Sequence, residues 1–125
     1  MKIMKSAEDY LEAMLMMQER HGYIRSIDIA AELGVTKPSV SYATRRLREA
    51  GYISMAEDGL ITLNPTGQEI AERIYERHKV LARLLMELGV SEKTALEDAC
   101  KVEHDLSIES FDAIKKHMKE HMTDQ

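Results

Sequence analysis

The sequence predicts a mainly α-helical protein that contains one small β-hairpin. Apolar residues recur every three or four positions in six segments, each bounded by glycine or by a helix-capping residue. Alternation of apolar and polar residues occurs in one place, around residues 52–63, as expected of paired strands. The 125 residues include nine Met, a single Phe and no Trp, so flexible thioether side chains must fill much of the space between helices. This length suits one domain or two small ones.

The first predicted helix starts at Ser6. Asp9 stands three residues later, which is the spacing of a capping box, and Gly22 suits the end of the helix. The apolar stripe between them consists of Leu11, Met14, Leu15 and Met17. Residues 23–25 then predict a short extended connector.

Two further helices follow, separated by a glycine turn. Ser26 is the expected cap of a helix that ends at Gly34, where glycine permits the left-handed backbone of a tight turn. Thr36 is the expected cap of a third helix over residues 37–50, and Pro38 is tolerated in its first turn because no intrahelical partner is lost there. The inner stripe of this helix consists of Val40, Ala43, Leu47 and Ala50.

The third predicted helix is followed by a β-hairpin. Residues 52–55 and 60–63 alternate apolar and polar side chains around an Asp58–Gly59 turn. The order helix, helix, glycine turn, helix, hairpin is that of a winged helix-turn-helix with a two-stranded wing. Residues 1–63 are therefore predicted to form an N-terminal DNA-binding domain.

The remainder of the chain predicts three helices and no strand. Pro65, with a second capping pattern from Thr66 to Glu69, opens a long helix to about residue 88. Ser91 caps a helix over residues 92–105, and Ser107 caps the last one. Residues 64–125 are predicted to form an all-helical domain, in which residues 64–75 are the linker part of the long helix.

The outward face of the third helix has the composition of a surface that enters the major groove of DNA. First-turn residues would approach base edges, whereas arginines one turn later would hold phosphates, with Thr44 assisting. The predicted DNA-binding residues are Thr36, Lys37, Pro38, Ser39, Ser41, Tyr42, Arg45 and Arg46. A charged helix face is often simply exposed to solvent. The hairpin favours DNA binding instead, because a small wing has no evident role beside a three-helix core that does not bind DNA. The net charge of −5 argues that a dimer or an effector is needed for tight binding.

Three potential metal ligands stand close together near residue 100. Cys100, Glu103 and His104 occupy positions i, i+3 and i+4, so they share one face of a helix. A thiolate, a carboxylate and an imidazole suit a first-row divalent metal. The spacing alone is weak evidence, because a lone cysteine is usually a small core residue.

Other potential ligands lie far from these in the sequence. Asp9 and Glu12 share one face of the first helix, where an N-terminal carboxylate also has a capping and dipole role. His78 falls on the apolar stripe of the long helix, where a histidine is by default a core residue. Each residue taken singly favours the plain structural interpretation, so only the whole set points to a metal.

The chain resembles the diphtheria toxin repressor family of metal-dependent transcriptional regulators, especially its short manganese transport regulator branch. The segments that carry the resemblance are residues 6–12, 38–41, 63–67, 77–78 and 100–107. The last is the most specific, because the sequence Glu-His-x-Leu-Ser follows the metal-binding helix of the family. The resemblance implies a repressor of metal-uptake genes that binds a palindromic operator as a homodimer when loaded with Mn²⁺ or Fe²⁺. The ligands that it implies are Asp9, Glu12, His78, Cys100, Glu103 and His104.

This chain combines features of two branches of that family. Asp9 matches the manganese branch, whereas Cys100 matches the iron branch, where the manganese branch has a carboxylate. Hard oxygen donors favour Mn²⁺ or Fe²⁺, and the thiolate pulls toward Fe²⁺, Co²⁺, Ni²⁺ or Zn²⁺. Leu96 and Ala82 stand at the positions of the iron branch's ancillary ligands, so that second site is not expected. The helices account for residues 64–125, so we expect no SH3-like domain of the longer relatives.

Two other functions are consistent with parts of the sequence. A winged-helix regulator could sense a small molecule or a redox change at Cys100 instead of a metal. An enzyme could use Cys100 with His104 as a nucleophile pair, but the chain has no Gly-rich loop and no evident oxyanion hole. The lone cysteine, the lack of an apolar run after Met1–Lys5 and the lack of a membrane-length segment predict a cytoplasmic protein.

Overall fold

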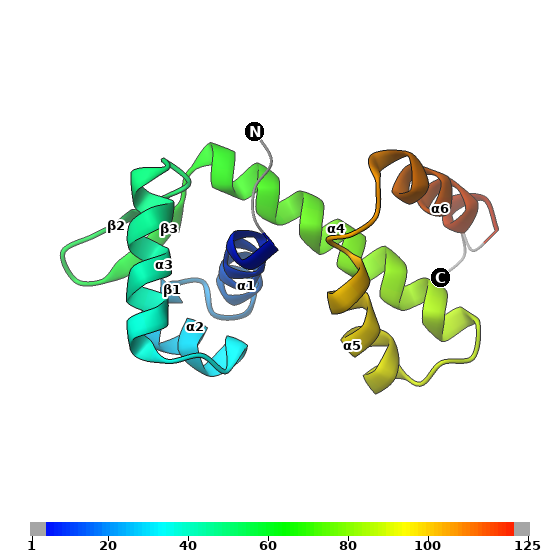
Figure 1. The fold of residues 1–125 in the computed structure, drawn as a ribbon, viewed down its shortest axis with the longest axis horizontal. Helices are drawn as coiled ribbons and strands as arrows, with labels where there is room; N and C mark the ends of the chain where they lie inside the picture. The colour runs from blue at the N-terminus through cyan, green and yellow to red at the C-terminus, as the bar shows by residue number, and fades with distance from the viewer. Residues whose placement is uncertain (1–4, 122–125) are drawn as a thin grey trace. The chain divides into compact units, whose positions relative to one another are not determined.

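The computed structural model describes residues 5–121, and most of the N-terminal segment used for the prediction of localisation lies outside this range. The chain divides into two compact units, residues 1–73 and 74–125, which are described separately below. Figure 1 labels their helices and strands along the chain. Within residues 5–121, none of the helices has the length and apolar character required to cross a membrane.

The first unit has the predicted order of helices and strands. Its elements are α1 (Lys5–His21), β1 (Ile24–Arg25), α2 (Ser26–Leu33), α3 (Lys37–Glu49), β2 (Ile53–Met55), β3 (Leu60–Leu63) and the start of α4 (Pro65–Glu87). Figure 1 shows α1, α2 and α3 grouped beside the small sheet. The core residues include Leu11, Met14, Ile29, Val40, Leu47 and Ile61, all buried. The winged helix-turn-helix prediction is confirmed.

The wing contains one more strand than the sequence indicates. The sheet is antiparallel with the order β1-β3-β2. Ile24 pairs with Ile61 on one side of β3, and Met55 pairs with the same Ile61 on the other side. The sequence predicted only an extended connector for β1, because two residues are too few to show an alternating pattern.

The predicted Asp-Gly turn joins β2 and β3. Gly59 has a positive φ of 89°, and its N–H donates to the carbonyl of Ala56 at 2.9 Å. The Asp58 carboxylate accepts from the N–H of Leu60 at 3.1 Å, which satisfies a backbone group at the start of the returning strand.

Three of the predicted helix caps are wrong, and for two of them a tertiary contact gives the reason. Ser6 already lies inside α1. Arg25 is held extended by its pairing with Leu60, so it becomes the cap residue of α2 and Ser26 is the first helical residue. The hydroxyl of Thr66 donates to the carbonyl of Gly51 at 3.2 Å instead of capping α4. The cap at Thr36 is confirmed, since its hydroxyl oxygen accepts from the N–H of Ser39 at 3.2 Å.

The start of α4 packs tightly on the base of the wing. A Cβ atom added to Gly67 would overlap the carbonyl oxygen of Tyr52. The same carbonyl accepts from the N–H of Asn64 at 2.9 Å, so it cannot move away without losing a hydrogen bond. Gly67 is therefore required by the close approach of two backbones and not by an unusual φ.

The second unit consists of the rest of α4, α5 (Glu92–Val102) and α6 (Ile108–His121). Leu81, Ala82 and Ala99 form its core, with Leu106 and Ile114 packed against them. The small alanines allow α4 and α5 to approach closely. Ala82, which the resemblance places where the iron branch has an ancillary ligand, is thus a core residue.

Two of the helix starts in this unit follow the sequence, whereas one helix end does not. The caps at Ser91 and Ser107 are confirmed by hydrogen bonds from the N–H groups of Thr94 and Ser110. α5 was predicted to reach residue 105 but ends at Val102, with Glu103 as its cap residue. Leu88, at the expected end of the long helix, lies one residue beyond α4 and is 72% exposed.

Candidate metal centre and DNA-binding helix

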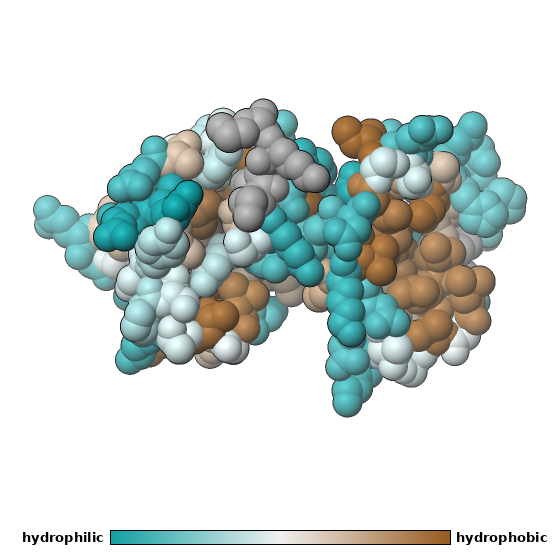
Figure 2. Space-filling model, viewed as in Figure 1, coloured by the Kyte–Doolittle hydropathy of each residue, from teal (hydrophilic) through white to brown (hydrophobic). Residues whose placement is uncertain are grey.

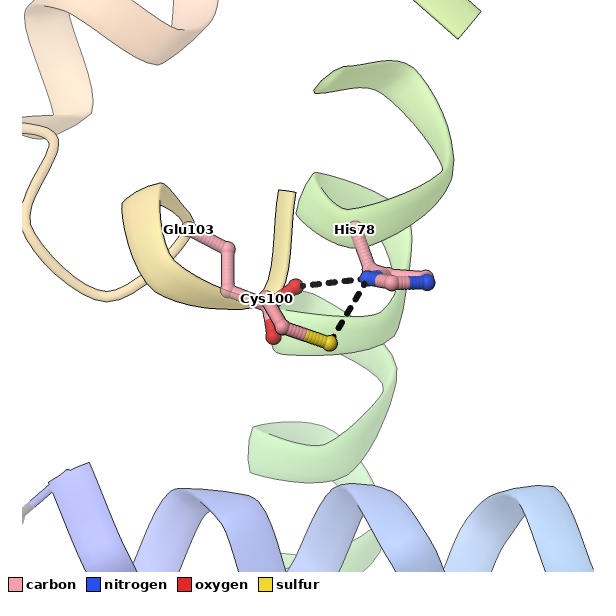
Figure 3. A group of neighbouring side chains, drawn as sticks. All are labelled: His78, Cys100 and Glu103. Atoms are coloured by element: carbon pink, nitrogen blue, oxygen red, sulfur yellow. Dashed lines mark hydrogen bonds and ion pairs between the residues drawn. The ribbon is translucent and has the colours of Figure 1, made fainter. Parts of the chain in front are cut away.

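Three of the predicted metal ligands come together in the second unit. One nitrogen of His78, the sulfur of Cys100 and one oxygen of Glu103 all lie within 4.8 Å of one another. The His78 Nδ1 atom is 3.2 Å from Glu103 Oε2 and 3.7 Å from Cys100 Sγ, as Figure 3 shows. α4 supplies the imidazole, and the end of α5 supplies the other two groups (Figure 3).

Local structure explains how these side chains reach one another. Cys100 lies in the last turn of α5, and Glu103 keeps helical backbone angles of −58° and −28° beyond it, so the two still share a face. Ala99, fully buried beside Cys100, lets α5 lie close to α4. His78 falls in register with Ile74 and Leu81 on the buried stripe of α4.

The carboxylate of Glu103 is the most buried charged group of this cluster. Its side chain has no exposed surface and lies between two imidazoles, those of His78 and His104. The His104 Nε2 atom is 3.5 Å from Glu103 Oε1, and this imidazole is 2% exposed. A carboxylate removed from water in this way requires compensating positive charge. His104 therefore belongs with the other three residues of the second unit.

The cluster changes the protonation of His78. Hydrogen bonds to Cys100 and then to Glu103 raise the pKa of His78 from 6.5 to about 10, and they outweigh the lowering effect of burial. At neutral pH the metal-free imidazole therefore carries a proton that binds both the sulfur and the carboxylate. A divalent cation would satisfy the same donor groups in place of that proton. This donor set fits a divalent transition metal.

The two remaining predicted ligands belong to the first unit. Asp9 and Glu12 lie one turn apart on α1, so they share one side of that helix. Glu12 is buried, with 6% of its surface exposed, and Asp9 is half-buried. Burial of an ordinary surface carboxylate would be unusual.

The predicted DNA-binding residues all lie on the cap or on the first ten residues of α3 and are exposed. Two of them are held by a neighbour. Arg46 Nη1 donates to the Tyr42 hydroxyl at 2.9 Å, and the guanidiniums of Arg45 and Arg46 lie 5.7 and 5.6 Å from the centre of the Tyr42 ring. The expected assistance from Thr44 is wrong. That side chain is buried and donates to the carbonyl of Ser41, because it faces the core.

Sequence reasoning did not find the structural role of Arg77. This arginine is 7% exposed, and its Nη1 atom donates to the carbonyl of Glu103 at 3.0 Å and to that of Leu106 at 2.7 Å. One feature of the sequence could have indicated this role: Arg77 stands next to His78, at a point where the apolar stripe of the long helix faces the core.

Comparison with known proteins identifies the family. Residues 2–60 match the iron-dependent repressor N-terminal DNA-binding domain, and residues 64–125 match the iron-dependent repressor metal-binding and dimerisation domain. The transcriptional regulator MntR of Salmonella typhimurium is 35% identical over 93% of this chain and 74% of its own length. The chain belongs to the iron-dependent repressor family. The resemblance to the diphtheria toxin repressor family is thereby confirmed.

Further relatives of this iron-dependent repressor extend the comparison. An HTH-type transcriptional regulator of Methanocaldococcus jannaschii is 37% identical over 92% of this chain and 94% of its own length. A manganese-dependent transcriptional repressor in complex with manganese superposes with a TM-score of 0.82 at 27% identity, over 90% of this chain and 52% of that one. The structure of IdeR from T. acidophilum shares the fold, with a TM-score of 0.81 at 24% identity, over 94% of this chain and 55% of that one. The chain thus spans about half the length of these two structures.

Family membership decides between the functions that the sequence left open. The protein is a metal-dependent transcriptional regulator and not an enzyme. Metal sensing is favoured over a small-molecule or redox signal. A divalent metal is its cofactor, and DNA and a second copy of the chain are its partners.

Proposed function

We propose that this iron-dependent repressor binds a palindromic operator as a homodimer when loaded with Mn²⁺ or Fe²⁺, and that it represses metal-uptake genes. The cluster of His78, Cys100 and Glu103 is the observation that carries the proposal. It brings together three potential ligands, of which the Glu103 carboxylate is fully buried, in a protein whose other unit is a winged helix.

The proposed ligands are His78, Cys100, Glu103 and His104 of the second unit, joined by Asp9 and Glu12 of α1. Support for the first four comes from their distances and, except for the exposed Cys100, from burial. Support for the last two comes from their spacing and from the burial of Glu12. A bound divalent cation neutralises carboxylates that otherwise repel one another. Ligands from both units would then couple metal binding to the order of the DNA-binding unit.

The donor set favours Mn²⁺ or Fe²⁺ while allowing other metals in vitro. Three carboxylates and two imidazoles are donors that Mn²⁺ and Fe²⁺ accept. The relatives named MntR and the manganese complex support manganese. The thiol of Cys100 adds affinity for Fe²⁺, Co²⁺, Ni²⁺ and Zn²⁺, so the physiological metal is decided by availability as well as by affinity.

The proposed DNA contacts lie on α3. Thr36, Lys37 and Pro38 at the start of the helix, with Ser39, Ser41 and Tyr42, are placed to approach base edges of the major groove. Arg45 and Arg46 are assigned to phosphates, because their guanidiniums lie one turn further along the helix.

The homodimer is proposed to form through the second unit. Several of its large apolar side chains are exposed, and Figure 2 shows apolar side chains gathered on this unit. They are Met86, Leu88, Leu96, Val102 and Ile108. Apolar surface of this kind on a small unit typically marks a protein interface. Two recognition helices related by a dyad would fit a palindromic site.

A DNA-binding titration tests the proposed function. Operator affinity is measured under anaerobic conditions with no metal and with Mn²⁺, Fe²⁺, Co²⁺, Ni²⁺ or Zn²⁺. We expect operator binding to require metal, and His78→Ala or Glu103→Ala to abolish the metal-dependent binding by removing a ligand. Metal-free protein that binds the operator as tightly as loaded protein would contradict the proposal and favour a different effector.

A further inference from the structure

Arg77 is a buried cation beside the candidate metal centre. It precedes His78 on α4 and is 7% exposed, although arginine is rarely buried unless its charge and donors are satisfied. Its Nη1 atom donates to two backbone carbonyls, that of Glu103 at 3.0 Å and that of Leu106 at 2.7 Å. The guanidinium carbon also lies 5.1 Å from the centre of the Phe111 ring.

These contacts tie three segments of the second unit together. α5 ends at Val102, so the carbonyls that follow have no partner within a continuing helix. Arg77 supplies donors for them from α4, and a cation is favourable at the C-terminal end of a helix. The Phe111 ring on α6 provides a flat apolar surface for the planar guanidinium. The turn between α5 and α6 is thereby held from two sides.

Two of the proposed metal ligands lie within this turn. Glu103 is itself one of the residues whose carbonyl Arg77 binds, and His104 is next in the chain. The Glu103 and Leu106 carbonyls bracket the backbone from which the His104 side chain projects. Fixing both carbonyls therefore holds the backbone of Glu103 and His104 in place. Their side chains are then positioned relative to His78, which lies on the same helix as Arg77.

We propose that Arg77 is a positioning residue for the metal centre: it orients Glu103 and His104 through their backbone. This inference rests on the proposed function, since it concerns the same site. Groups that orient metal ligands without touching the metal commonly affect affinity strongly. Lysine is a partial substitute at best, because an ammonium group can donate to the carbonyls but cannot stack on Phe111 as a plane.

The test is a titration of the full chain with Co²⁺. Binding is monitored by the absorption band that a Cys100 thiolate gives to bound cobalt. We expect Arg77→Met to weaken Co²⁺ binding by about tenfold or more and Arg77→Lys to weaken it less. Phe111→Leu, which removes only the stacking surface, should produce a smaller loss in the same direction. Lys79→Met is the matched control, because Lys79 is an exposed cation on the other side of His78, over the Tyr75 ring. It should leave cobalt affinity unchanged.

A double-mutant cycle separates positioning from general stability. If Arg77 acts through Glu103 and His104, the loss caused by Arg77→Met should be smaller in a Glu103→Gln background, where one of the two oriented ligands is already impaired. Equal losses in both backgrounds, or cobalt affinity of Arg77→Met equal to that of the unmodified protein, would overturn the inference. If Arg77→Met loses its helical circular dichroism, Arg77→Lys and Phe111→Leu decide in its place. A failure of the unmodified protein to bind cobalt, Mn²⁺ and Fe²⁺ alike would instead overturn the proposed function.

Discussion

The Nδ1 atom of His78 lies 3.2 Å from the carboxylate of Glu103, a residue 25 positions later in the chain whose side chain has no exposed surface. This pair makes the metal-free centre a protonated one. Hydrogen bonds that the imidazole donates to Cys100 and Glu103 raise the pKa of His78 to about 10, so the imidazole is a cation at neutral pH. A metal must displace this proton in order to bind.

Metal affinity should therefore rise with pH. Because His78 binds metal only when unprotonated, release of its one proton should tighten binding by about tenfold per pH unit below its pKa. The measurement is the dissociation constant for Mn²⁺ or Co²⁺ between pH 6 and pH 8, together with calorimetric counting of released protons. An affinity that stays constant over this range would show that His78 does not bind the metal.

Stability of the metal-free protein should change in the opposite direction. The pKa of His78 is raised above its unfolded value of 6.5, so the folded state binds more protons between that pH and about 10. The stabilisation is complete below pH 6.5 and is lost as pH rises through 10. Thermal unfolding of the metal-free chain should show a falling Tm over this window. In His78→Gln the fall should be smaller, and an identical fall would assign it to other groups.

Cys100 should determine the rank order of metals. Replacing it with glutamate substitutes a hard oxygen donor for a soft sulfur donor, so we expect Cys100→Glu to raise Mn²⁺ affinity relative to Co²⁺ and Zn²⁺. Competition titrations with a metal indicator measure the ratio. Cys100→Ser is the control for loss of the thiolate alone, and an unchanged ratio in both variants would exclude sulfur from the coordination sphere.

Gly67 should be intolerant of any side chain. A methyl group there overlaps the carbonyl oxygen of Tyr52, and the resulting shift of α4 from the wing should cost about 1–3 kcal/mol of stability. Urea unfolding of Gly67→Ala measures it. Glu69→Ala, an exposed change in the same helical turn, is the control. Equal stability of both variants would show that the two backbones separate freely.

Arg45 should contribute to DNA binding in a sequence-independent way. Because it is assigned to a phosphate, Arg45→Ala should weaken specific and non-specific binding alike and should reduce the salt slope of log K by about 1. Metal affinity should not change. The exposed Lys93 on α5 provides the control substitution to Ala. A selective loss at one base pair of the operator would instead indicate base recognition by Arg45.

Tyr42 has a role in positioning neighbouring arginines, in addition to the base contact that the sequence predicts. It was predicted to approach a base edge, and it remains exposed on α3. Its hydroxyl also accepts from Arg46, and its ring lies beneath two guanidiniums, so it restrains the side chains assigned to phosphates. Neighbours at i+3 and i+4 on a helix make such contacts possible, which is why this relationship was already implicit in the spacing.

By itself, the sequence determined the features that depend on neighbours a few residues apart. Thr36, Ser91 and Ser107 accept hydrogen bonds from N–H groups three residues later, and the Asp58–Gly59 turn closes within four residues. Helical spacing likewise placed Val40 and Leu47 in the core. These interactions join residues that are only a few positions apart, so they can be predicted without knowledge of the rest of the molecule.

Only the tertiary structure decided the features that depend on packing between distant segments. Strand β1 exists because Ile24 pairs with Ile61, and α5 ends at Val102, where Arg77 from another helix binds the carbonyls that follow. The sequence offered six metal ligands as a set, but the distances that join His78 to Cys100 and Glu103 come from the close approach of α4 and α5. Such an approach depends on the shape of the whole packed interface, which no local pattern contains.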